Sequence, residues 1–334
     1  MEIPVTYRES SALNQSRLKR ILQHPRLFIE ESAQSEFDEA SDHIDIGDAV
    51  DLLLTGGERE FHEQFIVGKI PRPTAQMGDF CWAKFKYRDF DTANQLAFDE
   101  VGIKRPKTVE EYLEKFEKEG RPYYDELLAA EGKRLLTPQK FETISRIVEA
   151  IKNNPHVYAH IDPDSEEYDT FYQVPLSWTT YVLDTPIKCK GLIDCVKVHK
   201  KSREATIIDV KTTRYSVGNF PISYLSYRYD FQGGWYHFGL NQDEETKAAL
   251  GITSVAENII FVVGSTKFPD QSLAYHMNGY QVGMTISGYT HEGKYYPGIT
   301  EALSRYVYHT KHDKWDYRQE EYEANFNVPI PKIV

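Results

Sequence analysis

The first part of the chain carries apolar residues at helical spacing. In residues 16–28 they recur three and four positions apart, which predicts a short helix that ends near Pro25. Residues 46–54 repeat this spacing, and the Gly-Gly pair that follows predicts the end of a second helix. The acidic and polar segment between them, residues 30–42, is typical of a loop.

Two more helices are predicted before the middle of the chain. Thr108 and Glu111 form a capping-box pattern, in which side chains bond the free backbone N–H groups at a helix start. A Thr-Pro pair begins the next helix at residues 137–151, and its apolar residues share one face. We therefore expect a mainly helical N-terminal portion over residues 1–155.

The pattern then changes to short segments rich in β-branched and aromatic residues, which predict strands at 172–182, 187–198 and 205–213. A helix is expected at residues 231–240 and a buried strand at 258–263. Beyond residue 264 the periodicity is weak. Helices that precede and interrupt a run of strands favour a single α/β domain over residues 1–334.

Composition changes the picture in two ways. A share of 40% hydrophobic and 13% aromatic residues is typical of a folded globular protein rather than a disordered one. The longest purely apolar run, residues 259–263, is far too short to cross a bilayer, and the first residues do not resemble a signal peptide, so we expect a cytoplasmic protein with no membrane partner. The three cysteines, Cys81, Cys189 and Cys195, are too scattered for a disulfide framework.

The net charge of −12 argues against nucleic acid as a partner when it is taken alone. Its distribution weakens that objection, because residues 188–228 contain nine Lys and Arg residues against three acidic ones. A locally basic face on an acidic protein is compatible with a nucleic-acid groove.

Two acidic residues and a lysine in the predicted strands carry the candidate chemistry. Asp209 and Lys211 are two positions apart, so their side chains share one face of the strand. A turn centred on Lys201 and Ser202 would place Asp194 directly opposite Asp209. Carboxylates that face each other destabilise a sheet by up to about 1 kcal/mol, and a divalent cation between them would remove that cost.

One or two carboxylates, completed by water and substrate phosphate, are the usual protein ligands of Mg²⁺. The neighbouring Lys211 could orient a water molecule and stabilise developing charge on a phosphate. An Asp-x-Lys pattern alone is more often a solvated strand end. The facing Asp194 and a predicted helix on which Gln232 and Tyr236 are stacked four residues apart favour the catalytic interpretation.

These residues resemble the PD-(D/E)XK nuclease superfamily, specifically its RecB/RecE-type branch, which includes exonuclease VIII and phage recombination exonucleases. The resemblance covers about residues 10–265. It rests on the segment Ser11-Ala-Leu-Asn-Gln-Ser16, on Ile44-Asp-Ile-Gly47-Asp-Ala-Val-Asp51, on Ile208-Asp-Val-Lys-Thr-Thr213, on Tyr227-Arg-Tyr229 and on Gln232-x-x-x-Tyr236.

The resemblance implies a restriction-endonuclease-like α/β core at residues 170–265, with a central mixed sheet flanked by helices, and a C-terminal extension of unclear role at residues 266–334. It implies that Asp194 and Asp209 hold Mg²⁺ or Mn²⁺ with the backbone carbonyl of Val210, and that Lys211 is the catalytic lysine. DNA-contacting positions would be Gln232, Tyr236, Thr212, Arg214 and Arg228.

Two positions depart from the family pattern. The motif helix that contains Gly47 usually carries His where this chain has Asp51, which could still bind a metal ion. The family often has a Glu on the strand before Asp194, and the nearest candidate here is Gln173, which is not an anionic ligand.

The sequence therefore predicts a metal-dependent DNA exonuclease that digests double-stranded ends in phage-type recombination or repair, in a bacterial host cell or encoded by a phage. The family resemblance also implies a possible homo-oligomer and a single-strand annealing partner. Three alternatives stay open: a degenerate nuclease that binds DNA or a partner without cutting, an endonuclease or single-strand-specific enzyme on the same core, and an interaction protein with no nucleic-acid role.

Overall fold

The computed structural model describes residues 10–30 and 42–327 of the chain. The chain divides into two compact units. Unit 1 comprises residues Met1–Glu36 and Glu149–Val334, and unit 2 comprises residues Phe37–Val148. The prediction of one nuclease domain over the whole chain stays a prediction.

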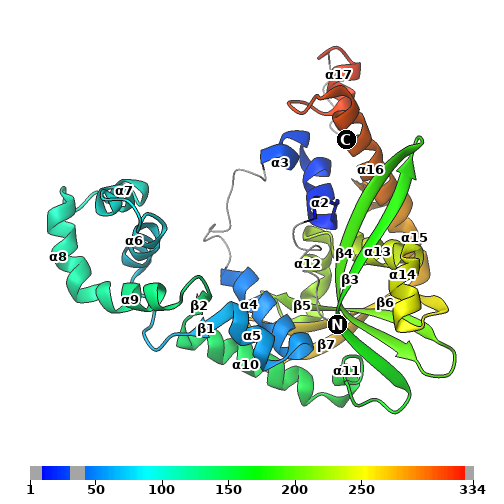
Figure 1. Ribbon diagram of the computed structural model, residues 1–334, viewed down its shortest axis with the longest axis horizontal. Coiled ribbons are helices and arrows are strands. Elements are labelled where there is room, and N and C mark those ends of the chain that lie inside the picture. Colours follow the sequence, from blue (N-terminus) through cyan, green and yellow to red (C-terminus); the bar gives the residue numbers. More distant parts are fainter. Residues whose placement is uncertain (1–9, 31–41, 328–334) are drawn as a thin grey trace. The chain divides into compact units, whose positions relative to one another are not determined.

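A five-stranded mixed sheet forms the centre of unit 1 (Figure 1). Its strands lie in the order of the chain: β3 (Tyr168–Val182), β4 (Thr185–His199), β5 (Glu204–Thr213), β6 (Ser254–Ser265) and β7 (Ser272–Met277). Only the β5–β6 pair is parallel among these neighbours. The predicted strands are thus confirmed, and β7 is added to them.

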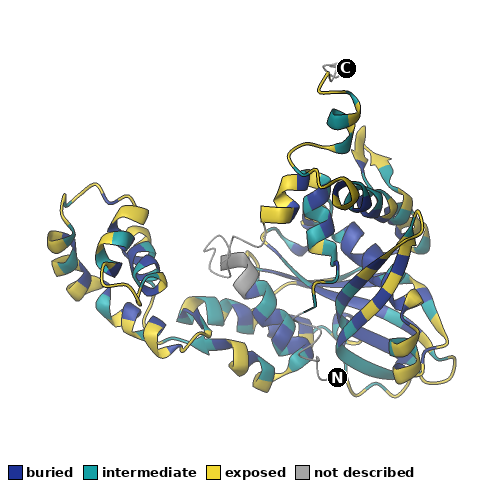
Figure 2. Ribbon diagram, turned by 45° about the horizontal axis from the view of Figure 1, so that its top comes forward, coloured by how far each residue is buried: buried dark blue, intermediate teal, exposed yellow. Residues whose placement is uncertain are grey.

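Helices connect β5 to β6, because parallel neighbours need a crossover. The connection comprises η3 (Val217–Asn219), α12 (Phe220–Ser226), α13 (Tyr229–Gln242) and α14 (Glu244–Leu250). The predicted helix at residues 231–240 is the middle of α13. Phe231, Trp235 and Leu240 of α13 are buried in one core with Ile207 and Ile259 of the sheet. Figure 2 shows buried residues along the strands of the sheet and on helices.

The remaining elements of unit 1 come from both ends of the chain. The predicted first helix is divided into α2 (Gln15–Gln23) and α3 (Pro25–Ile29), because Pro25 begins the second of them. Beyond the sheet lie α15 (Gly279–Ser287), β8 (Tyr289–His291), β9 (Lys294–Tyr296), α16 (Ile299–His312) and α17 (Gln319–Glu323), and α11 (Pro155–Tyr158) precedes β3. The C-terminal extension is therefore structured, and its α15 and α16 pack against α13.

Unit 2 is mainly helical, as the sequence predicts. It contains α4 (Asp42–Asp51), the π-helix η2 (Leu52–Gly56), α5 (Glu58–Gln64), α6 (Ala75–Lys86), α7 (Ala93–Glu100), α8 (Val109–Glu119), α9 (Arg121–Ala129), and the short parallel strands β1 (Phe65–Val67) and β2 (Arg134–Leu136). The helix α10 (Pro138–Lys152) crosses the boundary between the units. Thr108 caps α8 as its sequence pattern predicts. The predicted loop at residues 30–42 lies almost entirely outside the described residues.

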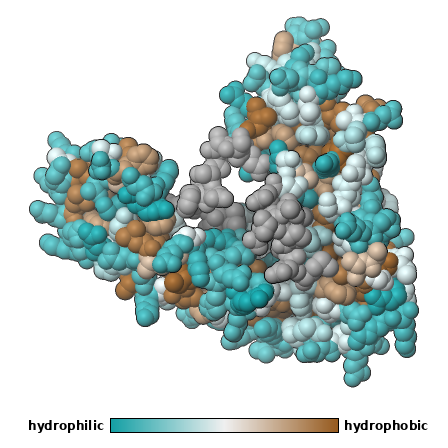
Figure 3. Space-filling model, in the orientation of Figure 1, coloured by the Kyte–Doolittle hydropathy of each residue, from teal (hydrophilic) through white to brown (hydrophobic). Residues whose placement is uncertain are grey.

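The surface of the described residues is mostly hydrophilic in the view of Figure 3, with smaller hydrophobic patches between. Within residues 10–30 and 42–327, no helix has both the length and the apolar character that a membrane crossing requires.

Candidate active site

The turn between β4 and β5 sets the register that the sequence predicts. Cys195 pairs with Ile208, and Val196 pairs with Ile207, so continuation of the ladder by one step would place Asp194 opposite Asp209. The ladder ends before that step. The two acidic residues therefore lie where β4 and β5 stop pairing, while Asp209 stays paired with Phe261 of β6.

Both β3 and β4 are irregular at this point. Gln173 of β3 lies opposite Asp194, and the two residues are left out of a register that is continuous on both sides of them. Gln173 has a φ of 49°, a left-handed conformation that non-glycine residues seldom adopt. Along β4, the residues that belong to the core include Cys189 and Ile193 before Asp194, and Val196 and Val198 after it. The alternation of a regular strand is therefore broken at this point. Because of this irregularity, Asp194 does not follow the regular alternation of side chains along β4.

Asp194 replaces the missing ladder bond with its side chain. Its Oδ2 accepts a hydrogen bond of 2.8 Å from the backbone N–H of Val210. Because this N–H is the next group on β5 after the paired region, the carboxylate satisfies a donor that the separation of the strands would leave free. The bond fixes Asp194 against the Asp-x-Lys segment.

Asp209 and Lys211 form a buried ion pair on the face of the sheet that α13 covers. Asp209 has no exposed surface, Lys211 is 13% exposed, and the lysine Nζ lies 2.6 Å from Oδ2 of Asp209. Within the described structure, no donor has the angles of a standard hydrogen bond to this oxygen. The contact with Lys211 is therefore an ion pair rather than a hydrogen bond. The ammonium also donates to the Val210 carbonyl at 3.3 Å. Burial acts to lower the pKa of Lys211, but Asp209 and Asp194 outweigh it and raise that pKa above its ordinary value.

Gln232 and Tyr236 of α13 cover the other side of Asp209. The Gln232 Nε2 donates to Oδ1 of Asp209 at 3.2 Å and to the Tyr236 hydroxyl oxygen at 3.0 Å. Burial raises the pKa of Tyr236 well above its ordinary value, and the carboxylates of Asp209 and Asp194 raise it further. The phenol is therefore neutral at physiological pH. Gly191 of β4 admits this ring, since a Cβ at that position would lie 3.3 Å from Tyr236 Cδ1.

Lys19 of α2 belongs to the same cluster, and the sequence does not single it out. Its Nζ donates to the backbone carbonyl of Tyr227 at 3.0 Å and lies 6.0 Å from the centre of the Tyr229 ring. Lys211 lies 5.1 Å from the centre of that ring. Burial, followed by the charge of Lys211, lowers the pKa of Lys19 to about 7. Nothing in the spacing of the first helix marks this lysine, because only packing brings it to the site.

The remaining predicted contacts lie farther from this cluster or have partners of their own. Thr212 follows Lys211 on β5, so its side chain points to the opposite face of the strand. Arg214 is exposed and donates to the Tyr215 hydroxyl. Arg228 is bound within the protein: its Nε and Nη2 donate to Asp230, and its Nη2 also donates to the Pro297 carbonyl. Its predicted DNA contact stays a prediction.

Gly47 and Asp51 lie on α4, in unit 2. The Asp51 Oδ1 accepts a hydrogen bond of 3.0 Å from the Thr55 hydroxyl. Its predicted role as a metal ligand stays a prediction.

The residues present at the cluster fit a hard divalent cation. The candidate metal ligands, Asp194, Asp209 and the Val210 carbonyl, all bind through oxygen, the ligand type that Mg²⁺ and Mn²⁺ prefer. The Oδ2 of Asp209 is buried and accepts no hydrogen bond of standard geometry, so it can bind a cation beside the Lys211 ammonium. No group of three or more His, Cys, Asp or Glu side chains with metal-binding geometry occurs among residues 10–30 and 42–327. Two carboxylates are nevertheless enough for Mg²⁺ when water and substrate phosphate complete its shell.

Comparison with solved structures supports the architecture. A crystal structure from Eubacterium rectale, described as a "Putative exonuclease", matches 100% of this chain and 96% of its own with a TM-score of 0.50 and 12% identity. The protein SSO0001 matches 45% of this chain and 60% of its own at 16% identity, with a TM-score of 0.25, which is too low to indicate a shared fold. No protein-family model matches the sequence, and no curated protein is significantly similar to it. The chain thus shares the fold of the Eubacterium rectale protein, and its five-stranded mixed sheet flanked by helices is the architecture that the sequence predicts.

Proposed function

We propose that this chain is a metal-dependent nuclease that hydrolyses DNA phosphodiester bonds at Asp194, Asp209 and Lys211. The observation that carries the proposal is the arrangement at the open end of the β4–β5 ladder. There a fully buried carboxylate lies 2.6 Å from a lysine ammonium, and the second carboxylate is held by the Val210 N–H. Burial of a charge pair lowers stability when the carboxylate oxygen accepts no standard hydrogen bond. A site with a purely structural role would avoid this cost.

Each side chain has a role that follows from its contacts. Asp194, Asp209 and the Val210 carbonyl would hold Mg²⁺ or Mn²⁺, and the bound ion would polarise a phosphate oxygen and lower the pKa of water. Gln232 keeps the Asp209 carboxylate in one orientation through its 3.2 Å hydrogen bond. Lys211 remains charged because its pKa is raised, so it would orient the attacking water by hydrogen bonding and stabilise negative charge on the phosphate.

We infer the substrate from the local charge and from structural similarity. Residues 188–228 are locally basic, and Lys19 adds an amine near the Tyr229 ring that Lys211 also contacts, which suits a phosphate backbone when that amine is charged. The Eubacterium rectale protein of similar fold is described as a "Putative exonuclease", which favours attack from DNA ends. With the resemblance to RecB/RecE-type enzymes, we infer double-stranded ends as the substrate, a role in phage-type recombination, a single-strand annealing partner and assembly into a homo-oligomer.

The test is digestion of linear and of covalently closed circular plasmid, each with Mg²⁺ and with EDTA. We expect the linear DNA to be degraded with Mg²⁺ only, while the closed circle persists. Cleavage of the circle would replace the exonuclease with an endonuclease, and cleavage in EDTA would overturn metal dependence.

A second candidate is a DNA-binding protein of nuclease fold that no longer cuts. It is favoured by Gln173, which places an uncharged amide opposite Asp194 where related sites often carry a Glu. In the plasmid experiment this protein would retard linear DNA without shortening it, at any Mg²⁺ concentration.

A further inference from the structure

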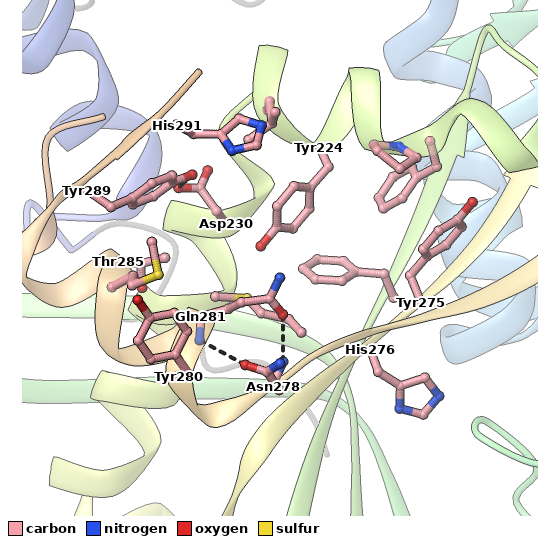
Figure 4. Close-up of a pocket in the computed structure, with 16 residues that line it drawn as sticks. Tyr224, Asp230, Tyr275, His276, Asn278, Tyr280, Gln281, Thr285, Tyr289 and His291 are labelled. Atoms are coloured by element: carbon pink, nitrogen blue, oxygen red, sulfur yellow. Dashed lines mark hydrogen bonds between the residues drawn. The ribbon is translucent and has the colours of Figure 1, made fainter. Parts of the chain in front are cut away.

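An aromatic pocket of about 490 Å³ lies in unit 1 between α12, β7 and α15 (Figure 4). Its volume falls in the range of about 300–1,000 Å³ that small-ligand sites occupy. Tyr280 and Tyr289 lie on one side of the Tyr224 ring, and Tyr275 lies on the other (Figure 4). Nothing in the chemistry of Asp209 and Lys211 described above requires this pocket.

The pocket lies next to the candidate active site in the sheet. Asp209 of β5 is the register partner of Phe261 of β6, and Phe261 is the partner of Tyr275 of β7. Partners on adjacent strands share a face, and strands are about 4.8 Å apart, so the pocket begins one strand away from the Asp209 carboxylate. Phe261 and Tyr275 both line it.

Two stacked rings form the wall between the pocket and the active site. The Phe220 ring, which lines the pocket, stacks on Tyr229 with 5.8 Å between ring centres. Lys211 lies 5.1 Å from the Tyr229 ring centre. Tyr229 thus contacts both the pocket wall, through Phe220, and the candidate active site, through Lys211.

The charge of the lining suits an uncharged ring rather than a phosphate. The acidic residue of the pocket, Asp230, is fully buried and paired with Arg228 at 3.0 Å, and it accepts a hydrogen bond from the Tyr289 hydroxyl. Most of the remaining lining is aromatic or aliphatic. A flat neutral ring can stack on such walls, whereas a phosphate would meet no Lys or Arg among the lining residues, which include only His276 and His291 as basic side chains.

The side-chain amides of Asn278 and Gln281 in the pocket can hydrogen-bond to different bases. Asn278 Oδ1 and Gln281 Oε1 accept backbone N–H groups in the capping box of α15, shown as dashed lines in Figure 4. With both oxygens used, their NH₂ groups are the atoms available to a ligand. Every nucleobase offers acceptor atoms on its edges, so donors alone discriminate weakly.

We propose that this pocket receives an unstacked nucleobase of the DNA strand whose backbone lies at Lys19, Lys211 and Asp209. This inference rests on the proposed function, since that function brings DNA to the neighbouring site. Stacking on aromatic side chains would hold the base with little sequence preference, and would draw the end of the strand out of the duplex towards Asp209.

The test compares two fluorescent duplexes, one with a short single-stranded tail and one with the same tail made of abasic sites. Their affinities are measured by anisotropy in EDTA, with 3′ and 5′ tails in turn, so that cleavage plays no part. We expect the wild-type chain to bind the base-bearing tail of one polarity at least about fivefold more tightly, the lower bound for stacking of one base. Tyr280→Ala and Tyr224→Leu should each reduce this preference.

Tyr181→Ala is the matched control, because Tyr181 is 70% exposed on β3 and Tyr280 is 78% exposed. Equal affinity of the wild-type chain for the two tails would overturn the inference, and so would a preference that both pocket variants retain in full. Failure to bind either duplex would overturn the proposed function as well. If the protein digests DNA with Mg²⁺ but binds both tails equally, the inferred base pocket is wrong and the proposed nuclease function stands.

Discussion

The Lys211 ammonium lies 2.6 Å from Oδ2 of Asp209, a carboxylate with no exposed surface. The two residues are separated by one position on β5, so the period of the strand alone brings them to one face. Removing one partner of a buried pair leaves the other charge uncompensated, at a cost of about 3–5 kcal/mol. Variants at either position must therefore be tested for folding as well as for activity.

Lys211→Ala is expected to abolish DNA cleavage and to leave DNA binding in EDTA largely intact. Cleavage is lost because no other lysine contacts Asp209 in the described structure, and binding persists because Lys19 and the basic segment remain. Gel assays of a labelled linear duplex measure both. Lys118→Ala on the exposed side of α8, outside the basic segment, is the control and should retain full activity. Retained cleavage in Lys211→Ala would show that its assigned role is wrong.

Asp209→Asn is expected to remove both the activity and the response of the protein to Mg²⁺. A ligand that binds only the folded state raises the melting temperature, so Mg²⁺ should stabilise the wild-type chain and leave the variant unchanged. Thermal melting with and without Mg²⁺ measures this directly. The control is Asp184→Asn, in the exposed β3–β4 turn, where Asn also tolerates the φ of 62°. An equal Mg²⁺ response in Asp209→Asn would place the ion elsewhere.

Lys19 should make DNA binding depend on pH. Its pKa is lowered to about 7, because burial and the charge of Lys211 disfavour the ammonium form. Below pH 7 the amine is charged and attracts phosphate; as the pH rises through the pKa it becomes neutral and affinity should fall. Bound phosphate stabilises the ammonium, so the fall would extend above pH 7. Binding isotherms in EDTA from pH 6 to 9 measure it.

Lys19→Arg supplies the comparison, since a guanidinium stays charged throughout this range. The variant should bind DNA with little pH dependence, whereas Lys19→Met should bind weakly at every pH. The same pKa predicts a stability change. The folded chain holds fewer protons on Lys19 than the unfolded chain between about pH 7 and the ordinary value of 10.5, so this residue's destabilising contribution should diminish as pH rises across that window. Equal pH profiles for wild type and Lys19→Arg would exclude Lys19 from DNA binding.

Gly239 allows α13 to approach β3, and Gly239→Ala should destabilise unit 1. A Cβ there would lie 2.6 Å from the Trp178 ring, which is itself buried against Trp235. Overpacking of this kind costs about 1–3 kcal/mol. Urea unfolding measures it. Gly283→Ala in α15 should have the opposite sign, a gain of about 0.5–1 kcal/mol, because no atom lies within 4 Å and Ala favours a helix.

Some of this protein follows from local periodicity. Alternation along residues 205–213 places Asp209 and Lys211 on one face, and the polar turn at Lys201 and Ser202 predicts the register that Cys195 and Ile208 adopt. The strands and the helix that carries Gln232 and Tyr236 are predicted correctly as well, whereas the mixed sheet is expected only from the family resemblance. In each case the determining interactions lie within one strand, one turn or one helix.

Only the tertiary structure decides the rest. The ladder ends before Asp194 and Asp209 pair, because Gln173 and Asp194 interrupt a register that no local pattern marks. Lys19 reaches Tyr229 from more than two hundred residues away, and the aromatic pocket combines α12, the sheet and α15. Sequence spacing determines which side chains share a face of one element, whereas the contacts between elements depend on how the whole core packs.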